Sequence, residues 1–159
     1  MAFRPIRTRK GKGQSMKLIT EMTEDVQLLI EEDKSTGVKE HYIQGVFMQA
    51  EQKNRNGRIY PLDIMSNEVE RYNTDLVSRN RAMGELNHPQ GPTVNLDRVS
   101  HMIKDLKCEG NDVIGKAKLL DTPMGNIAKN LVNEGAQLGV SSRGMGSLEE
   151  KNGVNYVKD

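Results

Sequence analysis

Cysteine, aromatic residues and net charge are all scarce in this chain of 159 residues. It has a single cysteine, 4% aromatic residues with no tryptophan, and a formal net charge of +1. One cysteine excludes an internal disulfide framework and is typical of a reducing compartment. Few aromatic side chains and little net charge remove the stacking surfaces and the electrostatic field on which nucleic-acid binding depends. We therefore expect no specific nucleic-acid partner.

Long apolar runs are also absent. No stretch approaches the ~18 residues that a membrane-spanning helix requires. The basic N-terminus leads into no apolar segment of the kind that a signal peptide contains. The sequence therefore predicts a soluble intracellular protein with no membrane partner, of a length typical of one domain.

Charge divides the chain into three parts. Residues 1–15 carry five arginines and lysines and no acidic residue, which predicts a basic, disordered leader. Residues 16–40 are acidic around the short apolar run "VQLLI", and we interpret them as a flexible segment and a candidate propeptide. Residues 41–159 contain the regular patterns of an ordered domain.

Strand and helix patterns alternate in the ordered part. Residues 41–51 and 99–108 read as strands, and 113–119 alternates apolar and polar residues after a turn at 110–112, which predicts a hairpin. Apolar residues at helical spacing follow Pro61 from Leu62 to Leu76. The class is therefore α+β with mostly antiparallel strands.

A second helix is predicted between Pro123 and Gly135, with Met124, Ile127 and Leu131, and in part Ala128 or Val132, as its buried stripe. The last eleven residues offer an Asn-Gly turn and the start of a strand that ends with the chain. We therefore expect a fold that is truncated at its C-terminus.

The stretch "GVSSRG", residues 139–144, has two readings. It is either a polar, glycine-rich turn or the site of a nucleophilic serine with backbone amides close by. A serine hydroxyl becomes a nucleophile only when a base within hydrogen-bond reach takes its proton. "MGELNHPQGP", residues 83–92, supplies a candidate base, because Pro89 holds His88 in an extended, stiff loop.

Other chemistries fit less well. The spacing is not that of the G-x-S-x-G nucleophile elbow, and no phosphate-binding G-x-x-x-x-G-K-[ST] is present. Glu85, His88, His101 and Cys108 lack metal-ligand spacing. We expect neither a metal nor a cofactor.

These two motifs carry a family resemblance. "GELNHP", followed about fifty residues later by "GVSSRG", resembles the prohead core protein proteases of T4-like tailed phages, as do "QAEQKNRNGRIYP" (49–61) and "EGNDVIGKAKLLD" (109–121). The match spans about residues 41–150 in order. Those proteases are similar in fold to the herpesvirus assemblins, which implies a compact, mostly antiparallel β-barrel ringed by helices and a protease domain over 41–159, incomplete at its C-terminus.

The resemblance also implies roles for residues. His88 would be the general base and Ser141 the nucleophile, with Ser142 as the alternative. The two serines would face opposite sides of an extended strand, so only one of them can meet His88. Arg143 and Gly144 would lie at the oxyanion site. The third member of the triad stays open, with Glu85 and Asp112 as the candidates.

The implied function is that of a serine endopeptidase inside the phage prohead, in the host cytoplasm. Its substrates would be scaffold or core proteins and capsid proteins, cut after Glu with an aliphatic residue two positions earlier. The chain itself contains such sites at Glu21, Glu31, Glu32 and Glu150, which predicts autocleavage. We also expect a homo-oligomer. The alternative is a non-enzymatic β-barrel with a structural or scaffold-binding role in capsid assembly.

Overall fold

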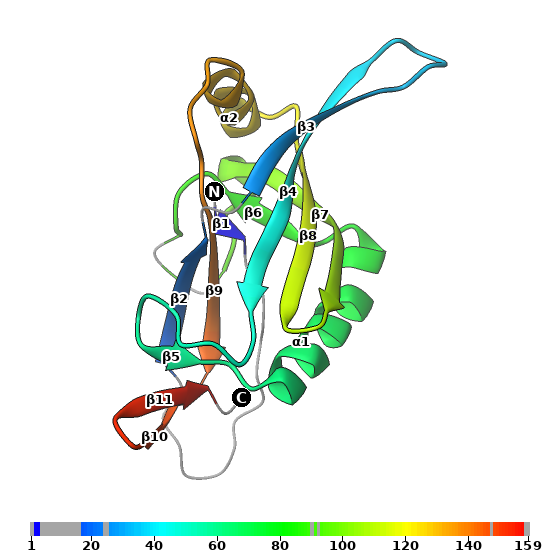
Figure 1. Cartoon of the computed structure of the whole chain (residues 1–159). Coiled ribbons are helices and arrows are strands. Elements are labelled where there is room, and N and C mark those ends of the chain that lie inside the picture. Colours follow the sequence, from blue (N-terminus) through cyan, green and yellow to red (C-terminus); the bar gives the residue numbers. More distant parts are fainter. Residues whose placement is uncertain are drawn as a thin grey trace.

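The computed structural model describes residues 2–3, 17–23, 26–89, 91, 93–146 and 148–157. Its helices are α1 (Leu62–Asp75) and α2 (Pro123–Asn133), with two single 3-10 turns, η1 (Val77–Arg79) and η2 (Leu96–Arg98). The strands are β1 (Ala2–Phe3), β2 (Lys17–Thr23), β3 (Val26–Glu32), β4 (Lys39–Gln49), β5 (Arg58–Ile59), β6 (Met83–Glu85), β7 (Val99–Glu109), β8 (Asp112–Leu119), β9 (Val140–Gly146), β10 (Leu148–Lys151) and β11 (Val154–Val157). The predicted α+β class with mostly antiparallel strands is confirmed (Figure 1).

Eight strands form the main sheet, in the order β2-β9-β1-β6-β7-β8-β4-β3. All neighbours are antiparallel except β1 and β9, which run parallel. The predicted hairpin of 99–108 and 113–119 is β7 and β8, joined through Gly110 at a φ of 60°. A small second sheet contains β10, β11 and β5, and its β10–β11 turn is the expected Asn-Gly turn, with positive φ at Asn152 and Gly153.

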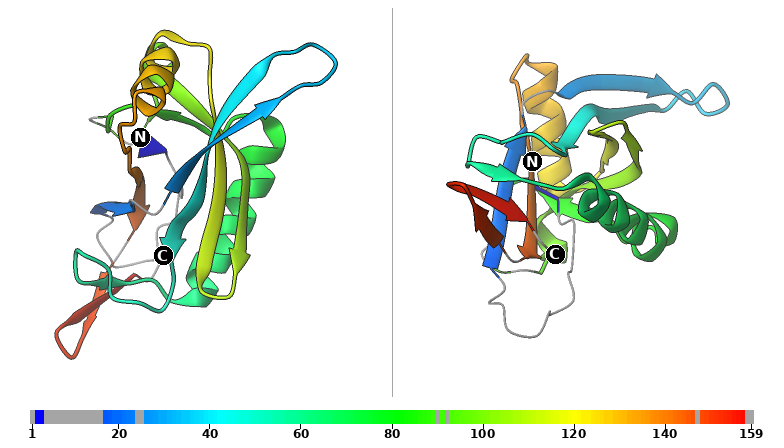
Figure 2. Two further views of the ribbon diagram at one scale, coloured as in Figure 1. Left: turned by 45° about the horizontal axis from the view of Figure 1, so that its top comes forward. Right: turned by 60° about the horizontal axis from the view of Figure 1, so that its bottom comes forward.

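The expected closed barrel is not present. β2 and β3 are the two ends of the main sheet, and no strand pairing joins them among residues 17–23 and 26–32. The sheet nevertheless curls, so that β4 lies close to β2 and β9, and the strand register shifts at three places along it. Instead of closing onto β2, β3 pairs with β4 and extends into an arm that projects from the body (Figure 2). The result is a strongly curved open sheet whose seam lies between its two end strands, β2 and β3.

Two helices flank the sheet, and they do not ring it. α1 packs on β7 through the buried side chains of Met65, Val69 and Tyr72, three of the predicted apolar positions. Asn73 fixes the contact by donating from Nδ2 to the carbonyl oxygen of Leu106 at 2.6 Å. Neither helix of the described chain has the length and apolar character that a membrane span needs.

The predicted buried stripe of α2 is confirmed at Ala128 and at Val132, which packs against the core, and is wrong at Ile127 and Leu131. Ile127 and Leu131 are 45% and 41% exposed, whereas Gly125 and Ala128 are buried. The helix begins at the predicted cap, where the Thr122 hydroxyl accepts the Gly125 N–H at 3.0 Å. Gly125, in the first turn of α2, lies against the backbone carbonyl groups of Leu120 and Ser100, which leaves no room for a larger side chain there. With this face of α2 turned inward, Ile127 and Leu131 point toward solvent.

The described part of the acidic segment has more regular structure than its composition predicted. The acidic segment forms β2 and β3, each part of a continuous antiparallel ladder, so the expectation of flexibility over 16–40 is wrong for 17–23 and 26–32. Within the basic leader, Ala2–Phe3 form β1, and residues 4–15 lie outside the described part of the chain.

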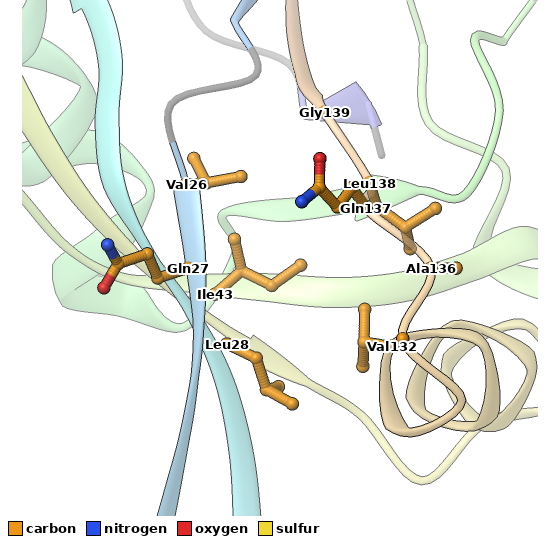
Figure 3. Close-up of a pocket in the computed structure, with 10 residues that line it drawn as sticks. Val26, Gln27, Leu28, Ile43, Val132, Ala136, Gln137, Leu138 and Gly139 are labelled. Carbon is orange, nitrogen blue, oxygen red and sulfur yellow. The ribbon is translucent and has the colours of Figure 1, made fainter.

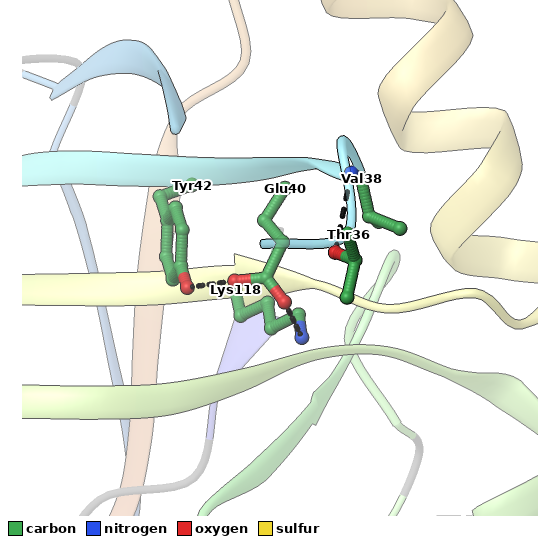
Figure 4. Close-up of polar contacts among 5 residues, drawn as sticks. All are labelled: Thr36, Val38, Glu40, Tyr42 and Lys118. Carbon is green, nitrogen blue, oxygen red and sulfur yellow. Dashed lines mark hydrogen bonds and ion pairs between the residues drawn. The ribbon is translucent and has the colours of Figure 1, made fainter. Parts of the chain in front are cut away.

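The face of the sheet away from the core is polar on β4 and β8. Glu40 accepts hydrogen bonds from the Tyr42 hydroxyl at 2.7 Å and from Lys118 at 2.9 Å (Figure 4). In the turn before β4, the Thr36 hydroxyl accepts the Val38 N–H. The hydrogen bond to Glu40 raises the pKa of Tyr42 to about 12 and lowers that of Glu40. The side chains of Glu40 and Lys118 thus form a charged surface on this face of the sheet. The apolar core lies on the opposite face.

The close approach of α2 to β7 makes Gly125 sensitive to substitution. In Gly125→Ala, the new Cβ would collide with the backbone carbonyl oxygens of Leu120 and Ser100, which have no rotamer to change. We expect a loss of about 1–3 kcal/mol in the free energy of unfolding. Urea denaturation measures it, with Asn130→Ala on the exposed face of the same helix as the matched control. Equal midpoints for the two variants would contradict the close packing.

Candidate active site

Ser141 lies on β9, second in the strand, and is 3% exposed. β9 is held on one side by β2, which pairs with it over residues 140–146, and on the other by β1, where Ala2 is opposite Ser141. The backbone of the serine is therefore fixed from both sides. Residues 136–139, which have no regular structure, lead from α2 into β9.

His88 reaches the serine from the loop that follows β6. The Ser141 Oγ lies 2.7 Å from the His88 Nε2, a hydrogen bond between residues 53 apart in the sequence. The separation matches the ~3 Å expected of a hydroxyl and a base that share a proton. With the imidazole neutral and its proton on Nδ1, Nε2 accepts the hydroxyl hydrogen.

Sheet register explains why Ser141, and not Ser142, meets the histidine. Ala2 pairs with both Ser141 and Glu85, so Ser141 and Glu85 lie in one row across three strands and their side chains project to the same face. Phe3 pairs with Ser142 and Gly84, so Ser142 lies in the next row and its side chain projects to the other face. Ser142 is also buried, at 5% exposure, but on the side of Val140 and the core.

Glu85 closes the loop that carries His88. Its carboxylate is 3% exposed, and Oε2 accepts the Asn95 backbone N–H at 3.0 Å and the Asn95 Nδ2 at 3.4 Å. The Arg98 Nε lies 3.9 Å from Oε1. A buried carboxylate is costly unless donors surround it, so these partners hold Glu85 in place and tie the two ends of the loop together. Asn95 and Arg98 carry no motif by which the sequence could have identified them.

Asp112, the other carboxylate proposed for the triad, is not part of this cluster. It is paired with Glu109 at the far end of the β7–β8 hairpin, where its Oδ1 accepts from Gln49 Nε2 at 3.1 Å. Glu85 of β6 is opposite Val99, at the other end of β7 and ten residues from Glu109. The rise of an extended strand therefore puts roughly 30 Å between Glu85 and Asp112.

The other predicted site residues lie on strands. Arg143 and Gly144 continue β9 and are paired in register with Thr20 and Ile19 of β2. Glu31 and Glu32 are exposed near the tip of the β3–β4 arm, Glu150 is exposed on β10, and Glu21 is opposite Ser142 within the β2–β9 ladder. No three His, Cys, Asp or Glu side chains converge as metal ligands among the residues that the structure describes.

His101 is a second buried histidine near the serine strands. It is opposite Gly84 in the row of Ser142, 1% exposed, and its Nδ1 lies 2.8 Å from the Ser100 Oγ. Burial lowers the pKa of His101 to about 3, so the imidazole is neutral at neutral pH. It is therefore a core residue on the opposite face from Ser141.

Comparison with known proteins gives three consistent matches. The sequence model of the family described as prohead core protein serine protease matches residues 11–159. The prohead core protein protease of Enterobacteria phage T4 is 40% identical over 137 residues, which are 83% of this chain and 64% of that protein. The chain thus spans 64% of the length of this curated relative. The solved structure of the bacteriophage T4 capsid assembly protease superposes with a TM-score of 0.85 at 31% identity, over 91% of this chain and 90% of that chain.

The hydrogen bond between Glu85 and the Asn95 amide should protect that amide from hydrogen exchange. In Glu85→Ala, the Asn95 amide loses its charged acceptor, and we expect its hydrogen exchange to accelerate by about tenfold or more, as a bond of roughly 1.5–3 kcal/mol to a charged group implies. Glu85→Gln keeps an oxygen acceptor and should retain part of the protection. Amide exchange followed by NMR measures both, with amides of β8 as the internal control. Unchanged exchange at Asn95 in Glu85→Ala would show that the carboxylate does not hold the loop.

Proposed function

The chain belongs to the family of prohead core protein serine proteases, and we propose that it is a serine endopeptidase that acts in capsid maturation. The observation that carries the proposal is the 2.7 Å contact between the Ser141 Oγ and the His88 Nε2. A buried serine hydroxyl against a loop histidine is the arrangement by which a weak alcohol becomes a nucleophile.

Peptide hydrolysis on these residues proceeds in two halves. The Ser141 Oγ attacks the carbonyl carbon of the substrate while His88 takes the hydroxyl proton. The C–N bond then breaks, His88 gives the proton to the leaving amine, and an acyl-enzyme remains on Ser141. Water, deprotonated by His88, releases the acid and restores the serine.

Backbone amides of β9 are our proposal for stabilising the tetrahedral oxyanion. Arg143 and Gly144 follow the serine and pair with β2. In an antiparallel ladder, successive N–H groups point to alternate sides, so one of these two amides points away from β2. An amide fixed by a strand needs no reorganisation as charge develops on the oxygen.

Glu85 is our choice for the carboxylate that supports His88. It shares a face with Ser141 and closes the loop on which His88 lies, whereas Asp112 is at the far end of the hairpin. Its hydrogen bonds to Asn95 support a positioning role, exerted through the loop. Glu85→Ala should then lower kcat more than it raises KM, and Glu85→Gln should recover part of the loss.

The proposed substrates are scaffold or core proteins and capsid proteins within the prohead of a phage, cut after Glu. The relatives are named for the prohead core and for capsid assembly, which supports this setting.

Replacing the two reacting residues tests the proposal. Ser141→Ala and His88→Ala should each lower kcat for peptide hydrolysis by on the order of 10⁴–10⁶, as loss of a member of such a pair does in other serine proteases. A fluorophosphonate should label wild type stoichiometrically, His88→Ala far more slowly, and Ser141→Ala not at all. Ser142→Ala is the matched control, because it removes the neighbouring hydroxyl from the other face of the strand, and it should keep both labelling and turnover.

A folded wild type that neither hydrolyses peptides nor reacts with the phosphonate would overturn the enzymatic proposal. The non-enzymatic role in capsid assembly would then account for the family resemblance. If Ser141→Ala and Ser142→Ala lost the same amount of activity, the assignment of Ser141 as the nucleophile would be wrong.

Autocleavage, if it occurs between molecules, should favour the arm. Glu31 and Glu32 are exposed in the last two pairs of the β3–β4 ladder, next to its turn, where only the end of the ladder must open. Glu21 lies inside the β2–β9 ladder, more of which would have to open before a protease could bind it. Mass spectrometry of the incubated protein should show cuts after Glu31 or Glu32 ahead of any after Glu21, and none in Ser141→Ala. Glu150, exposed on the β10–β11 hairpin, is the next candidate. A first cut after Glu21 would contradict this order.

A further inference from the structure

Both residues of the Ser141–His88 pair are connected to α2. At the start of the helix, Thr122 is bonded to the first residue of β7, where the loop that carries His88 ends. At the other end, residues 135–139 run past β3, with which they line an apolar groove, and lead into β9 one residue before Ser141 (Figure 3). The position of this helix therefore affects both reacting residues.

The loop between β6 and β7 ends at a shift in the strand register. Gly84 of β6 is opposite His101 of β7, but the next residue, Glu85, is opposite Val99. Ser100 therefore has no opposite residue on β6, and it is fully buried. A residue inserted in this way, as in a β-bulge, redirects the neighbouring side chains and is often found next to active sites. The direction in which the loop leaves the sheet thus depends on how Val99 and Ser100 are held.

The carbonyl groups of both residues are bonded to the segment that begins α2. The Ser100 oxygen accepts the Leu120 N–H at 3.0 Å, and the Val99 oxygen accepts the Thr122 hydroxyl at 2.6 Å. β8 ends at Leu119, and the chain then turns into the helix. A side chain, rather than a backbone amide, therefore makes the last bond to the end of the loop.

The Thr122 hydroxyl has two partners of opposite kind. The Gly125 N–H, 3.0 Å from Oγ1, can only donate, and the Val99 carbonyl oxygen can only accept. The hydroxyl hydrogen therefore points to Val99, while a lone pair points to Gly125. Capping of a helix needs the acceptor alone, which Ser, Thr, Asp and Asn all supply. The donated bond is thus an addition to the cap.

We propose that Thr122 is a positioning residue for the peptide hydrolysis proposed above, and the inference rests on that proposed function. Its hydroxyl fastens the end of the His88 loop to α2. The hydrogen bond between Glu85 and Asn95 closes the loop on itself, and the bond from Thr122 to Val99 ties it to the helix that leads to the nucleophile. Together these bonds hold the imidazole within reach of the serine.

Three substitutions separate the donated bond from the cap. Thr122→Ser keeps both hydrogen bonds. Thr122→Asp keeps an acceptor for the Gly125 N–H, but an ionised carboxylate has no hydrogen to donate to the Val99 oxygen. Thr122→Val keeps the shape of the side chain and loses both bonds. Asp121→Ala is the matched control, because Asp121 is exposed at the same end of the helix and accepts from Asn126 Nδ2 at 3.0 Å.

Turnover of internally quenched peptides by the full chain should follow the donor, whereas stability should follow the cap. Thr122→Asp and Thr122→Val should lower kcat about tenfold or more, with KM nearly unchanged, because a displaced base impairs the chemical step. Thr122→Ser and Asp121→Ala should keep the wild-type kcat. In urea, Thr122→Asp should unfold at a higher midpoint than Thr122→Val. If kcat follows the urea midpoint across the series, with Thr122→Asp close to wild type, capping alone explains the residue and the proposal is overturned.

Amide hydrogen exchange gives a readout that does not depend on activity. Inside the loop, the Asn95 amide is bonded to Glu85 and the Arg98 amide to the Asn95 carbonyl oxygen, each at 3.0 Å. Release of the end of the loop in Thr122→Asp should accelerate exchange at both amides about tenfold. Thr122→Ser and Asp121→Ala should leave it unchanged. Wild-type exchange in Thr122→Asp would show that Thr122 does not hold the loop, and the proposal would be wrong.

Fluorophosphonate labelling of Ser141 keeps this proposal distinct from the protease itself. If wild type is labelled and cleaves peptides but Thr122→Asp retains full kcat, the positioning role is wrong and the protease stands. If a folded wild type is not labelled, the protease fails and the positioning role in turnover fails with it. The exchange measurement then still reports whether Thr122 holds the loop.

Discussion

A single hydrogen bond between two side chains, Ser141 and His88, depends on almost every other part of this structure. It is worth only about 1 kcal/mol by itself, so it cannot hold its own partners in place. β9 and β6, from which the two residues come, are not adjacent in the sheet. Their separation is set by the one strand between them, β1, and by the ladders of β2 and β7 on either side. The geometry of the pair is therefore a property of the sheet.

The loop after β6 adds the second constraint. A histidine on a long loop would sample many positions, but the ends of this loop are joined through the buried carboxylate of Glu85 and the backbone of Asn95.

The polar residues near the site lie on two different faces of the sheet. Ser141 and Glu85 share one face, while Ser142 and the neutral His101 lie on the core side. Alternation along extended strands thus separates two adjacent serines into different environments.

The open seam gives the curved sheet a feature that full closure would remove. A closed barrel satisfies every strand edge within itself, which leaves no ladder for a peptide to join. Here β3 turns away to form the arm, and its first residues line an apolar groove together with residues 135–139. The same region shows the rotation of α2, whose small residues meet β7 and whose Ile127 and Leu131 face solvent.

Local patterns in the sequence were sufficient for several parts of this protein. Helical spacing from Leu62 predicted α1, alternation predicted the β7–β8 hairpin, and the extended geometry of "VSSR" put the two serines on opposite faces, because these features depend on near neighbours in the chain. The proximity of Ser141 to His88 was an inference from family motifs, and it took the fold to bring together residues 53 apart. Long-range packing decided the rest: the ordering of the acidic segment by strand pairing, the inward face of α2, the loop clamp at Asn95 and the seam left by β3. Each of these depends on which surfaces meet, and a one-dimensional pattern carries no information about the partner that a surface will find.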